Sequence, residues 1–296
     1  MDLSWLDDFL ALAETLNFSR AAEARHVTQP AFSRRIQALE AWIGTKLLAR
    51  STHGVALTAA GAHLRSRAEA MARDVRRLRT ETLEVAGRET ASLSFTATHA
   101  LSFTFFPRWI RERERAAPLG AINLISDSMA GCEQIMLRGR AQFLLCHAHR
   151  DSPNRLQGVA FSSIRIGNDV LLPLAAPDTR GAAPWSLDAP PAKPIPHLAY
   201  SADSGLGRIV AAHRAIGSAK LDVVFTSQLA ATLLSMTLAK RGIAWLPQSL
   251  AQDDLDHGRL VAVGGKRWQI PVEVRLFRPV ADQGRAAEGL WATVSA

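Results

Sequence analysis

The sequence predicts an α/β protein with a small N-terminal helical domain, one long helix and two C-terminal α/β lobes. Three observations predict this class. Short helical patterns separated by turn residues come first, a single unbroken apolar repeat follows, and strand patterns alternate with helical patterns after Gly87. We therefore expect a first domain at residues 1–58, a linker helix at 59–88 and the lobes at 89–296.

A helix-turn-helix is predicted between Phe18 and Gly44. Ser19 can cap a helix over residues 20–25 and Thr28 can cap the next helix, because an N-cap hydroxyl accepts a hydrogen bond from a first-turn amide. Pro30 falls in the first turn of the second helix, where its missing amide proton costs little. One apolar face recurs along that helix at spacings of four, three and four, and comprises Phe32, Ile36, Leu39 and Ile43.

The opposite face of the second helix carries side chains that suit DNA. Gln can bond adenine bidentately, Arg can bond guanine, and the N-terminal half of a recognition helix enters the major groove. The DNA contacts expected from the two helices are Ser19, Arg20, Thr28, Gln29, Pro30, Ser33, Arg34, Arg35 and Gln37. A purely structural helical corner with a solvated polar face is the alternative. The excess of basic over acidic side chains from Phe18 to Arg67 favours DNA.

A β-hairpin is predicted directly after the helices. Residues 46–50 and 55–57 are two short strand candidates, and the turn between them is tipped by Gly54. Such a hairpin is a wing, whose tip would position the protein on a phosphate backbone or minor groove without specifying sequence. The wing residues expected there are Arg50, Thr52 and His53.

A heptad pattern predicts that the long helix pairs with a second copy of the chain. Beginning after a cap at Thr58, the seam alternates spacings of four and three, which is an a/d pattern that favours a partner helix. Its residues are Leu64, Ala68, Met71, Val75, Leu78, Thr82 and Val85, with Gly87 as the expected stop. An amphipathic helix packed on its own domain is the alternative. The strict heptad phase over about three heptads favours a dimer.

Strands alternating with helices imply parallel sheets covered by helices, here in two lobes joined by two crossovers. Helices are expected at residues 102–115, 131–139, 204–216 and 227–241, and the Pro-rich stretch 182–196 is expected to be a surface connection. We place lobe I at about residues 89–164 and 270–296, and lobe II at about residues 165–269. In such a fold a ligand lies between the lobes, at strand carboxyl ends and helix N-termini. The residues expected there are His99, Ala100, Leu101, Ser102, Ser126, Asp127, His147, Tyr200, Ser201, Ser204, Thr226, Ser227, Trp245 and Pro247.

Three serines indicate the charge of that ligand. Ser102, Ser204 and Ser227 each stand where a helix is expected to begin, and free amides together with the helix dipole favour an anion there. The alternative is that each Ser merely caps its helix. We predict a small anionic effector, such as a carboxylate or a halide.

The two cysteines, Cys132 and Cys146, indicate a reducing compartment and no disulfide framework. A thiol near a helix start, as at Cys132, can have a lowered pKa, yet most free cysteines in such places are small core residues. In a regular strand Cys146 points away from His147 and His149, so no metal site is expected. No cofactor is expected either.

The remaining composition fits a cytoplasmic protein with a nucleic-acid partner. The net charge is +8, no apolar span is long enough for a membrane, and Asp2 stands where a secretion signal would be basic. Motifs for a zinc hydrolase, a serine hydrolase elbow and a phosphate loop are missing, and the run from Gly205 lacks the third Gly of a dinucleotide fingerprint. We therefore expect no enzyme and no membrane partner.

The N-terminal motifs resemble the LysR-type transcriptional regulators. The resemblance rests on AlaAla at 21–22, ThrGlnProAlaPheSerArgArgIle from Thr28, LeuGlu at 39–40, Gly44 and LeuThrAlaAlaGly from Leu57. It implies a winged helix-turn-helix, a long linker helix and an effector domain resembling type 2 periplasmic binding proteins. The lobes are similar to the hypochlorite-responsive branch of that family. The similar residues are HisAlaLeuSer and PhePhePro after His99, TyrSer at 200, GlyArg at 207 and GlyIleAlaTrpLeuPro from Gly242.

Together these patterns predict a sequence-specific transcription factor, assembled as a homodimer or homotetramer, whose DNA contacts are modulated by an effector between the lobes. RNA polymerase is an open further partner. One alternative is an oxidant-responsive factor using sulfur or halide chemistry, although Met is scarce and Leu206 and Gln228 stand near the crevice where a sulfur sensor would sit. The other alternative is an architectural DNA-binding protein without an effector.

Overall fold

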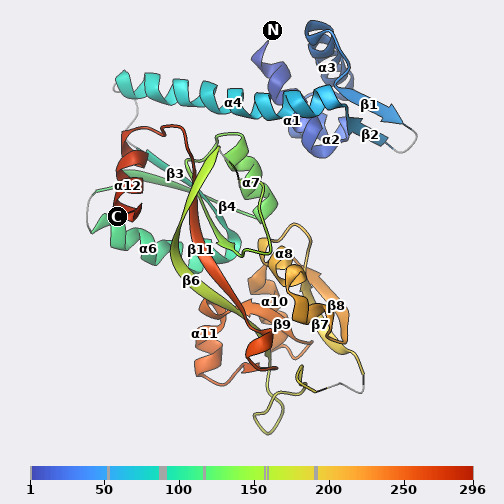
Figure 1. Ribbon diagram of the computed structural model, residues 1–296, viewed down its shortest axis with the longest axis vertical. Coiled ribbons are helices and arrows are strands. Elements are labelled where there is room, and N and C mark those ends of the chain that lie inside the picture. Colours follow the sequence, from blue (N-terminus) through green and yellow to red (C-terminus); the bar gives the residue numbers. More distant parts are fainter. Residues whose placement is uncertain are drawn as a thin grey trace. The chain divides into compact units, whose positions relative to one another are not determined.

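The computed structural model describes residues 2–51, 54–86, 92–115, 118–156, 158, 160–189 and 193–295. The chain divides into two compact units, residues 1–85 with 137–140 and residues 86–136 with 141–296, and each is described by itself. Figure 1 labels their helices and strands. Among the described helices, none combines the length and the apolar character that a membrane crossing requires.

The first unit begins with a winged helix-turn-helix (Figure 1). Its elements are α1 (Leu3–Thr15), α2 (Phe18–Ala24), α3 (Gln29–Ile43) and the antiparallel pair β1 (Leu48–Ser51) and β2 (Gly54–Leu57). The predicted apolar face of α3 is confirmed, because Phe32 and Leu39 are fully buried in a core with Phe9 and Ala21. The three helices thus hold the polar face of α3 outward.

Two helix starts differ from the prediction. Asn17, and not Ser19, caps α2, because the Asn17 side-chain oxygen accepts hydrogen bonds from the amides of Ser19 and Arg20 at 3.0 and 3.1 Å. Thr28 occupies the N-cap position of α3 as expected, but its hydroxyl makes no capping hydrogen bond. The amide side chain two residues before Ser19 therefore satisfies the orphan amides that its hydroxyl was expected to bind.

The end of α3 is tied to the wing by Glu40. Its buried carboxylate accepts hydrogen bonds from the amides of Leu47 and Leu48 at 2.9 and 3.3 Å and from Lys46 Nζ at 2.8 Å. Because Glu40 holds these residues, the first strand begins at Leu48 and not at the predicted Lys46. Gly44 ends α3 at a φ of 83°, a left-handed conformation that favours glycine.

The predicted long helix is α4 (Ala59–Val85), and the Thr58 hydroxyl accepts a hydrogen bond from the Gly61 amide at 3.0 Å as its cap. A Cβ at Gly61 would lie 2.1 Å from the Leu47 carbonyl oxygen, so this motif glycine allows the close approach of the hairpin. Along the seam, Leu64 and Ala68 pack within the first unit. The later seam residues Met71, Val75 and Leu78 are 44 %, 42 % and 63 % exposed. The expected stop at Gly87 lies outside the described residues.

The second unit contains two α/β lobes that share two long strands (Figure 1). Lobe I holds β3 (Ser92–Thr98), α5 (His99–Thr104), α6 (Phe106–Glu114), β4 (Ala121–Asp127), α7 (Met129–Leu137), β5 (Phe143–Ala148) and α12 (Arg285–Ser295). Lobe II holds β7 (Ile195–Tyr200), α8 (Gly205–Ala212), α9 (Arg214–Gly217), β8 (Leu221–Ser227), α10 (Ala230–Leu238), β9 (Ala244–Pro247), α11 (Gln248–Asp256), β10 (Val261–Ala262) and the short 3₁₀ helix η1 (Lys266–Trp268). The crossover strands are β6 (Phe161–Ala175) and β11 (Ile270–Pro279).

The expectation of parallel sheets is only partly right. β3 pairs in parallel with β4 and β5, and β7 pairs in parallel with β8. However, β6 pairs antiparallel with β9, β10 and β11, and β11 pairs antiparallel with β5. The chain enters lobe II along β6 and returns along β11, so the two crossover strands must run in opposite directions.

Several predicted helices also have different bounds. The helix expected at 102–115 is two helices, α5 and α6, which meet at Phe105. The helix expected at 204–216 is likewise divided into α8 and α9, and α11 was not predicted. The Pro-rich stretch is not wholly a surface connection, because Leu187 is buried in the core of lobe II and β7 begins at Ile195.

Candidate DNA interface and effector site

The polar face of α3 presents the predicted DNA-reading side chains. Arg34 and Gln37 are exposed, as are Gln29 and Pro30 in the first turn, while Ser33 is half-buried. Ser19, Arg20 and Thr28 are exposed around the start of α2 and the start of α3. Because the buried face of α3 anchors the helix, these side chains are held on one rigid surface.

Arg35 has an internal partner that sequence reasoning missed. Its guanidinium lies 3.3 Å from the fully buried Asp8 carboxylate, which also accepts a hydrogen bond from Arg25 at 2.7 Å. Both arginines therefore hold α2 and α3 against α1. The sequence did contain a signal for this contact, because Asp8 is an acidic residue on the otherwise apolar face of α1. A carboxylate buried there requires a positively charged partner.

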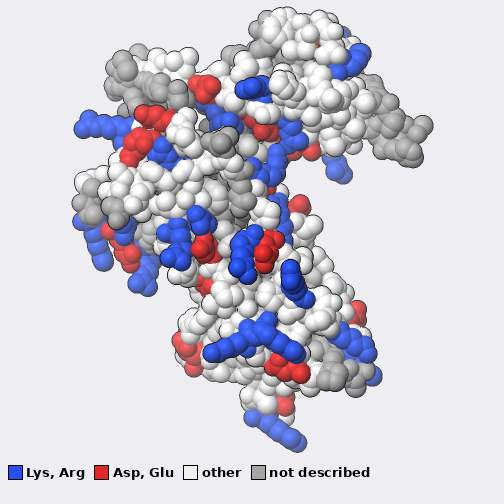
Figure 2. All heavy atoms as spheres, viewed as in Figure 1, with Lys and Arg blue, Asp and Glu red and all other residues white. Residues whose placement is uncertain are grey.

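The wing hairpin is present, and Arg50 belongs to its first strand. The tip residues Thr52 and His53 lie outside the described residues. Figure 2 shows that Lys and Arg side chains of the second unit are interspersed with Asp and Glu on the face drawn. The overall positive charge therefore does not by itself mark the DNA surface.

A small cavity of about 30 Å³ lies between the two lobes. From lobe I it is lined by Thr98, His99, Ala100, Asp127, Ser128, Met129 and His147, and from lobe II by Ser204, Gly205, Leu206, Gln228 and Ala230. A single water needs at least about 10–15 Å³ of such space, so the cavity has room for a small ion or one or two waters.

Two residues that line this cavity carry buried polar atoms without a hydrogen-bond partner among the described residues. Thr98 Oγ1 and His147 Nδ1 are buried and have no hydrogen-bond partner among the described residues, and both residues line the cavity. The buried Tyr200 hydroxyl also has no such partner, and burial together with the negative charge of Asp169 raises its pKa. Buried polar groups in native proteins are nearly always hydrogen-bonded, so these atoms require a ligand or water.

His147 is oriented by a buried carboxylate. Its Nε2 lies 3.3 Å from Asp169 Oδ2, and Asp169 also accepts hydrogen bonds from the Ser249 hydroxyl at 2.5 Å and the Val170 amide at 2.8 Å. Burial opposes ionisation, but the hydrogen bonds and the charge of His147 outweigh it and hold the pKa of Asp169 below its ordinary value. An ionised Asp169 requires a proton on Nε2, which leaves Nδ1 as an acceptor in neutral His147 and as a donor in its protonated form.

Helix starts contribute to the cavity unequally. The Ser204 hydroxyl caps α8 as predicted, accepting a hydrogen bond from the Gly207 amide at 3.3 Å. The positive N-terminal end of α7 is already occupied by the carboxylate of Asp127, whose Oδ1 accepts a hydrogen bond from the Ser128 amide at 2.6 Å. An anion would therefore find the starts of α8 and α10 more favourable than the start of α7.

Two of the three predicted serine caps are wrong. Ser102 lies inside α5, where its hydroxyl donates to the His99 carbonyl oxygen at 2.7 Å. Ser227 ends β8, and its hydroxyl accepts a hydrogen bond from Leu229, which is itself the N-cap residue of α10. The first helix begins earlier than its apolar pattern indicates and the other begins later, so neither hydroxyl stands at a helix start.

Other predicted crevice residues lie elsewhere in the second unit. Ser126 Oγ contacts His99 Nδ1 and Ser102 Oγ, each at 3.0 Å, in an exposed cluster of lobe I. The cavity lining does not include Leu101, Ser102, Ser126, Tyr200, Ser201, Thr226, Ser227, Trp245 or Pro247. Leu101 and Trp245 are core residues of their lobes, each 1 % exposed. Met129 was missed because α7 begins two residues before the predicted Gly131.

Both thiols are buried side chains. Burial raises the pKa of Cys132 to about 12, which outweighs the hydrogen bond that its sulfur accepts from Thr96 at 3.2 Å. Proximity to a helix start therefore does not lower this pKa, and Cys132 is the small core residue that the sequence favoured. Burial also raises the pKa of Cys146, so both residues are protonated packing groups at neutral pH.

An ion pair joins the lobes close to the cavity. Glu133 of α7 is fully buried, and Arg208 of α8 donates to its two carboxylate oxygens at 2.9 and 3.3 Å. The Arg155 amide donates to the same carboxylate at 3.1 Å. The starts of α7 and α8 both line the cavity, so this pair fixes the distance between its two walls.

A winged helix-turn-helix, a long helix and a two-lobed α/β domain together define a DNA-binding transcriptional regulator with a separate effector domain. Residues 3–62 match the bacterial regulatory helix-turn-helix protein family of the lysR type, and residues 86–296 match the LysR substrate binding domain. The chain therefore belongs to the LysR family of transcriptional regulators. The predicted resemblance and fold class are confirmed.

Individual relatives are similar over nearly the whole chain. The HTH-type transcriptional regulator YjiE of Escherichia coli (strain K12) is 28% identical, covering 98% of this chain and 93% of the relative. The crystal structure of Vibrio fischeri DarR in complex with DNA has a TM-score of 0.58 at 28% identity and covers 99% of this chain and 98% of that chain. Full-length HypT from Salmonella typhimurium, a hypochlorite-specific LysR-type regulator, has a TM-score of 0.58 at 26% identity and covers 100% of this chain and 99% of that chain.

Proposed function

We propose that two copies of this regulator pair through α4, that each reads its operator through Arg34 and its neighbours on α3, and that a small anion between the lobes controls the DNA contacts. The exposed seam residues of α4 support pairing, and the exposed polar face of α3 supports sequence reading. The domain limits proposed for these roles remain residues 1–58, 59–88 and 89–296.

The observation that carries the effector proposal is the pair of unpartnered atoms, Thr98 Oγ1 and His147 Nδ1, in a cavity of about 30 Å³. The Thr98 hydroxyl and the start of α8, joined by Nδ1–H when His147 carries a proton on both ring nitrogens, would together coordinate a halide or a small carboxylate such as formate. The ligand would touch both lobes and so bind one lobe arrangement better than another. The resulting population shift would change the spacing or orientation of the two winged helix-turn-helix domains of the dimer on DNA.

Substitution of Thr98 tests this proposal. Thr98→Val keeps the shape of the side chain but removes the hydroxyl, so the free protein should lose no stability, since that hydroxyl has no partner. Affinity for chloride, bromide or formate, measured by thermal shift at constant ionic strength, should fall roughly tenfold. Thr293→Val is the matched control, because it makes the same change in α12 of lobe I, outside the cavity lining. Equal anion affinity in Thr98→Val and the wild type would refute the site.

An oxidant response is the second candidate, and Met129 favours it. This residue is 3 % exposed and lines the same cavity, so a thioether is present there although Met is scarce in the sequence. Hypochlorous acid would transfer its oxygen to the sulfur, giving methionine sulfoxide and chloride, and would turn an apolar wall of the cavity polar. The similarity to a hypochlorite-specific regulator supports testing it.

The oxidant test compares two methionines. Met129→Leu should abolish any hypochlorite-dependent change in operator binding, and Met236→Leu should not, because Met236 packs against the core of lobe II and does not line the cavity. Peptide mass spectrometry would locate the added oxygen. An unchanged hypochlorite response in Met129→Leu would exclude this sulfur as the sensor while leaving the anion proposal standing.

A further inference from the structure

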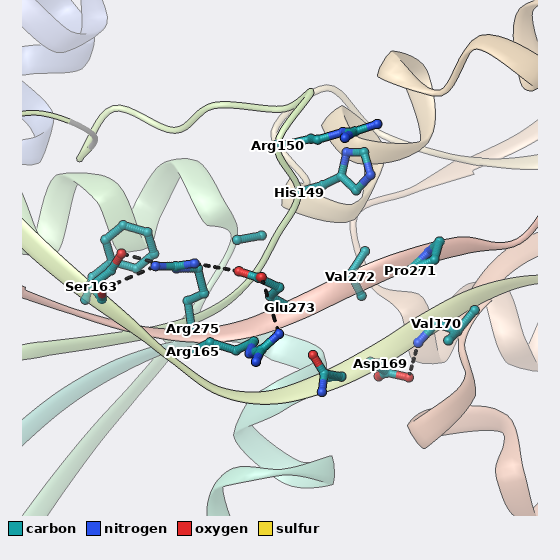
Figure 3. Close-up of a pocket in the computed structure, with 13 residues that line it drawn as sticks. His149, Arg150, Ser163, Arg165, Asp169, Val170, Pro271, Val272, Glu273 and Arg275 are labelled. Atoms are coloured by element: carbon teal, nitrogen blue, oxygen red, sulfur yellow. Dashed lines mark hydrogen bonds and ion pairs between the residues drawn. The ribbon is translucent and has the colours of Figure 1, made fainter. Parts of the chain in front are cut away.

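We propose a second ligand site on the outer face of the crossover strands, one that takes a small organic carboxylate with an apolar body. The site is a groove of about 720 Å³ formed by β6, β11 and the residues that follow β5 (Figure 3). It shares no lining residue with the inter-lobe cavity, and of these two spaces the groove alone has the volume for a ligand with a sizeable apolar body.

The groove follows from the alternation of side chains along two neighbouring strands. Arg165 of β6 stands opposite Arg275 of β11, and Asn168 stands opposite Glu273. All four line the groove, whereas the intervening side chains, such as Val274, belong to the core of lobe I. One face of this ribbon is therefore buried and the other is open.

Positive charge predominates in the groove. Three guanidinium groups, those of Arg150, Arg165 and Arg275, face it together with the carboxylate of Glu273. The other lining carboxylate, Asp169, is already engaged by His147 and Ser249. An anion entering the groove would therefore meet a net positive field.

The three arginines are not equivalent. Arg275 is fixed, because Nη1 lies 2.5 Å from Glu273 Oε2 while Nε and Nη2 each lie 3.2 Å from oxygens of Ser163. Arg165 is 60 % exposed and its nearest approach to Glu273 is 3.9 Å, too long for a hydrogen bond. The Glu273 carboxylate thus accepts its hydrogen bond from Arg275. The guanidinium of Arg165 can therefore bind the carboxylate of a ligand bidentately.

Figure 3 shows that the groove has two chemically different ends. Ser163 and Arg275 lie toward one end, and Val170, Pro271 and Val272 lie toward the other, with Arg165 and Glu273 between them. Outward charges on a strand are commonly just solvated. Here they border a hollow with an apolar end, so a carboxylate on Arg165 would place its apolar body against the Pro271 side.

Binding of phenylacetate to the full-length protein, followed by calorimetry, tests the proposal, with neutral phenylacetamide as the charge control. We expect phenylacetate to bind, phenylacetamide to bind at least tenfold more weakly, and Arg165→Gln to weaken phenylacetate binding about tenfold. Arg165 is largely exposed, so this variant should fold normally, which its thermal unfolding would confirm.

Two further variants locate the binding. Arg180→Gln removes an exposed arginine outside the groove lining and should bind phenylacetate like the wild type. Thr98→Val alters only the inter-lobe cavity and should also leave phenylacetate binding unchanged. Equal binding in Arg165→Gln and the wild type, or no phenylacetate binding at all, would overturn the outer site without bearing on anion binding between the lobes. Loss of phenylacetate binding in Thr98→Val would also overturn the outer site, and it would place the carboxylate between the lobes instead.

Discussion

Breaking the ion pair between Glu133 and Arg208 should loosen the two lobes. Replacing Arg208 with Met leaves the Glu133 carboxylate buried with a single amide donor, that of Arg155. Breaking a buried pair by removing one partner costs about 3–5 kcal/mol. Because the Arg208 side chain is 29% exposed, water can replace part of the loss, and we expect a cost of about 3 kcal/mol, near the lower limit.

A double-mutant cycle measures this coupling. Glu133→Gln, Arg208→Met and the double variant would be compared by thermal unfolding of the full chain, followed through near-ultraviolet circular dichroism. A cost of about 3 kcal/mol corresponds to roughly 6–12 °C for a domain of this size. The double variant should be more stable than Arg208→Met alone, since it buries no unpaired charge. If the double variant lost the sum of the two single effects, the pair would have no coupling and the reasoning would be wrong.

The remaining predictions concern the DNA-binding unit. Arg34→Ala should weaken specific operator binding by about 1–3 kcal/mol and narrow the difference between cognate and random DNA in a mobility-shift titration. Asn17→Ala should cost about 1 kcal/mol of unfolding free energy, and Ser19→Ala much less, because Asn17 makes the cap. Burial opposes ionisation of Glu40, but hydrogen bonds from Lys46 and two amides hold its pKa below the usual 4.5. Its stabilising contribution is therefore present above that value and lost as pH falls through the folded pKa, so Glu40→Gln should flatten the acid limb of stability against pH.

Local patterns predicted the elements that depend on neighbouring residues. The apolar spacing of α3 and the cap of α4 at Thr58 both follow from residues close in sequence. The choice of Asn17 over Ser19 as a cap could not be predicted with confidence in that way, because both side chains can reach first-turn amides and only the backbone decides between them.

The site depended on contacts that local patterns do not contain. The antiparallel course of β6 and β11 is set by the return of the chain to lobe I, and it brings Asp169 to His147 across 22 positions of sequence. Met129 reached the cavity because α7 begins earlier than its apolar spacing indicates. Leu101 follows the end of β3 and Trp245 lies within β9, and the large apolar side chains of both are more stable in the lobe cores than in a crevice.

The position of Asp169 gives a physical reason why occupancy of the cavity would be felt by both lobes. Asp169 lies on a crossover strand, binds His147 of lobe I, and accepts hydrogen bonds from the hydroxyl and amide of Ser249 in lobe II. An anion held at His147 Nδ1 would polarise the imidazole and so strengthen its hydrogen bond to Asp169. That change would alter the bonds that Asp169 shares with Ser249, and it would add to the direct contacts of the ligand with both lobes. Asp169→Asn should therefore weaken the DNA response to the anion more than it weakens anion binding itself.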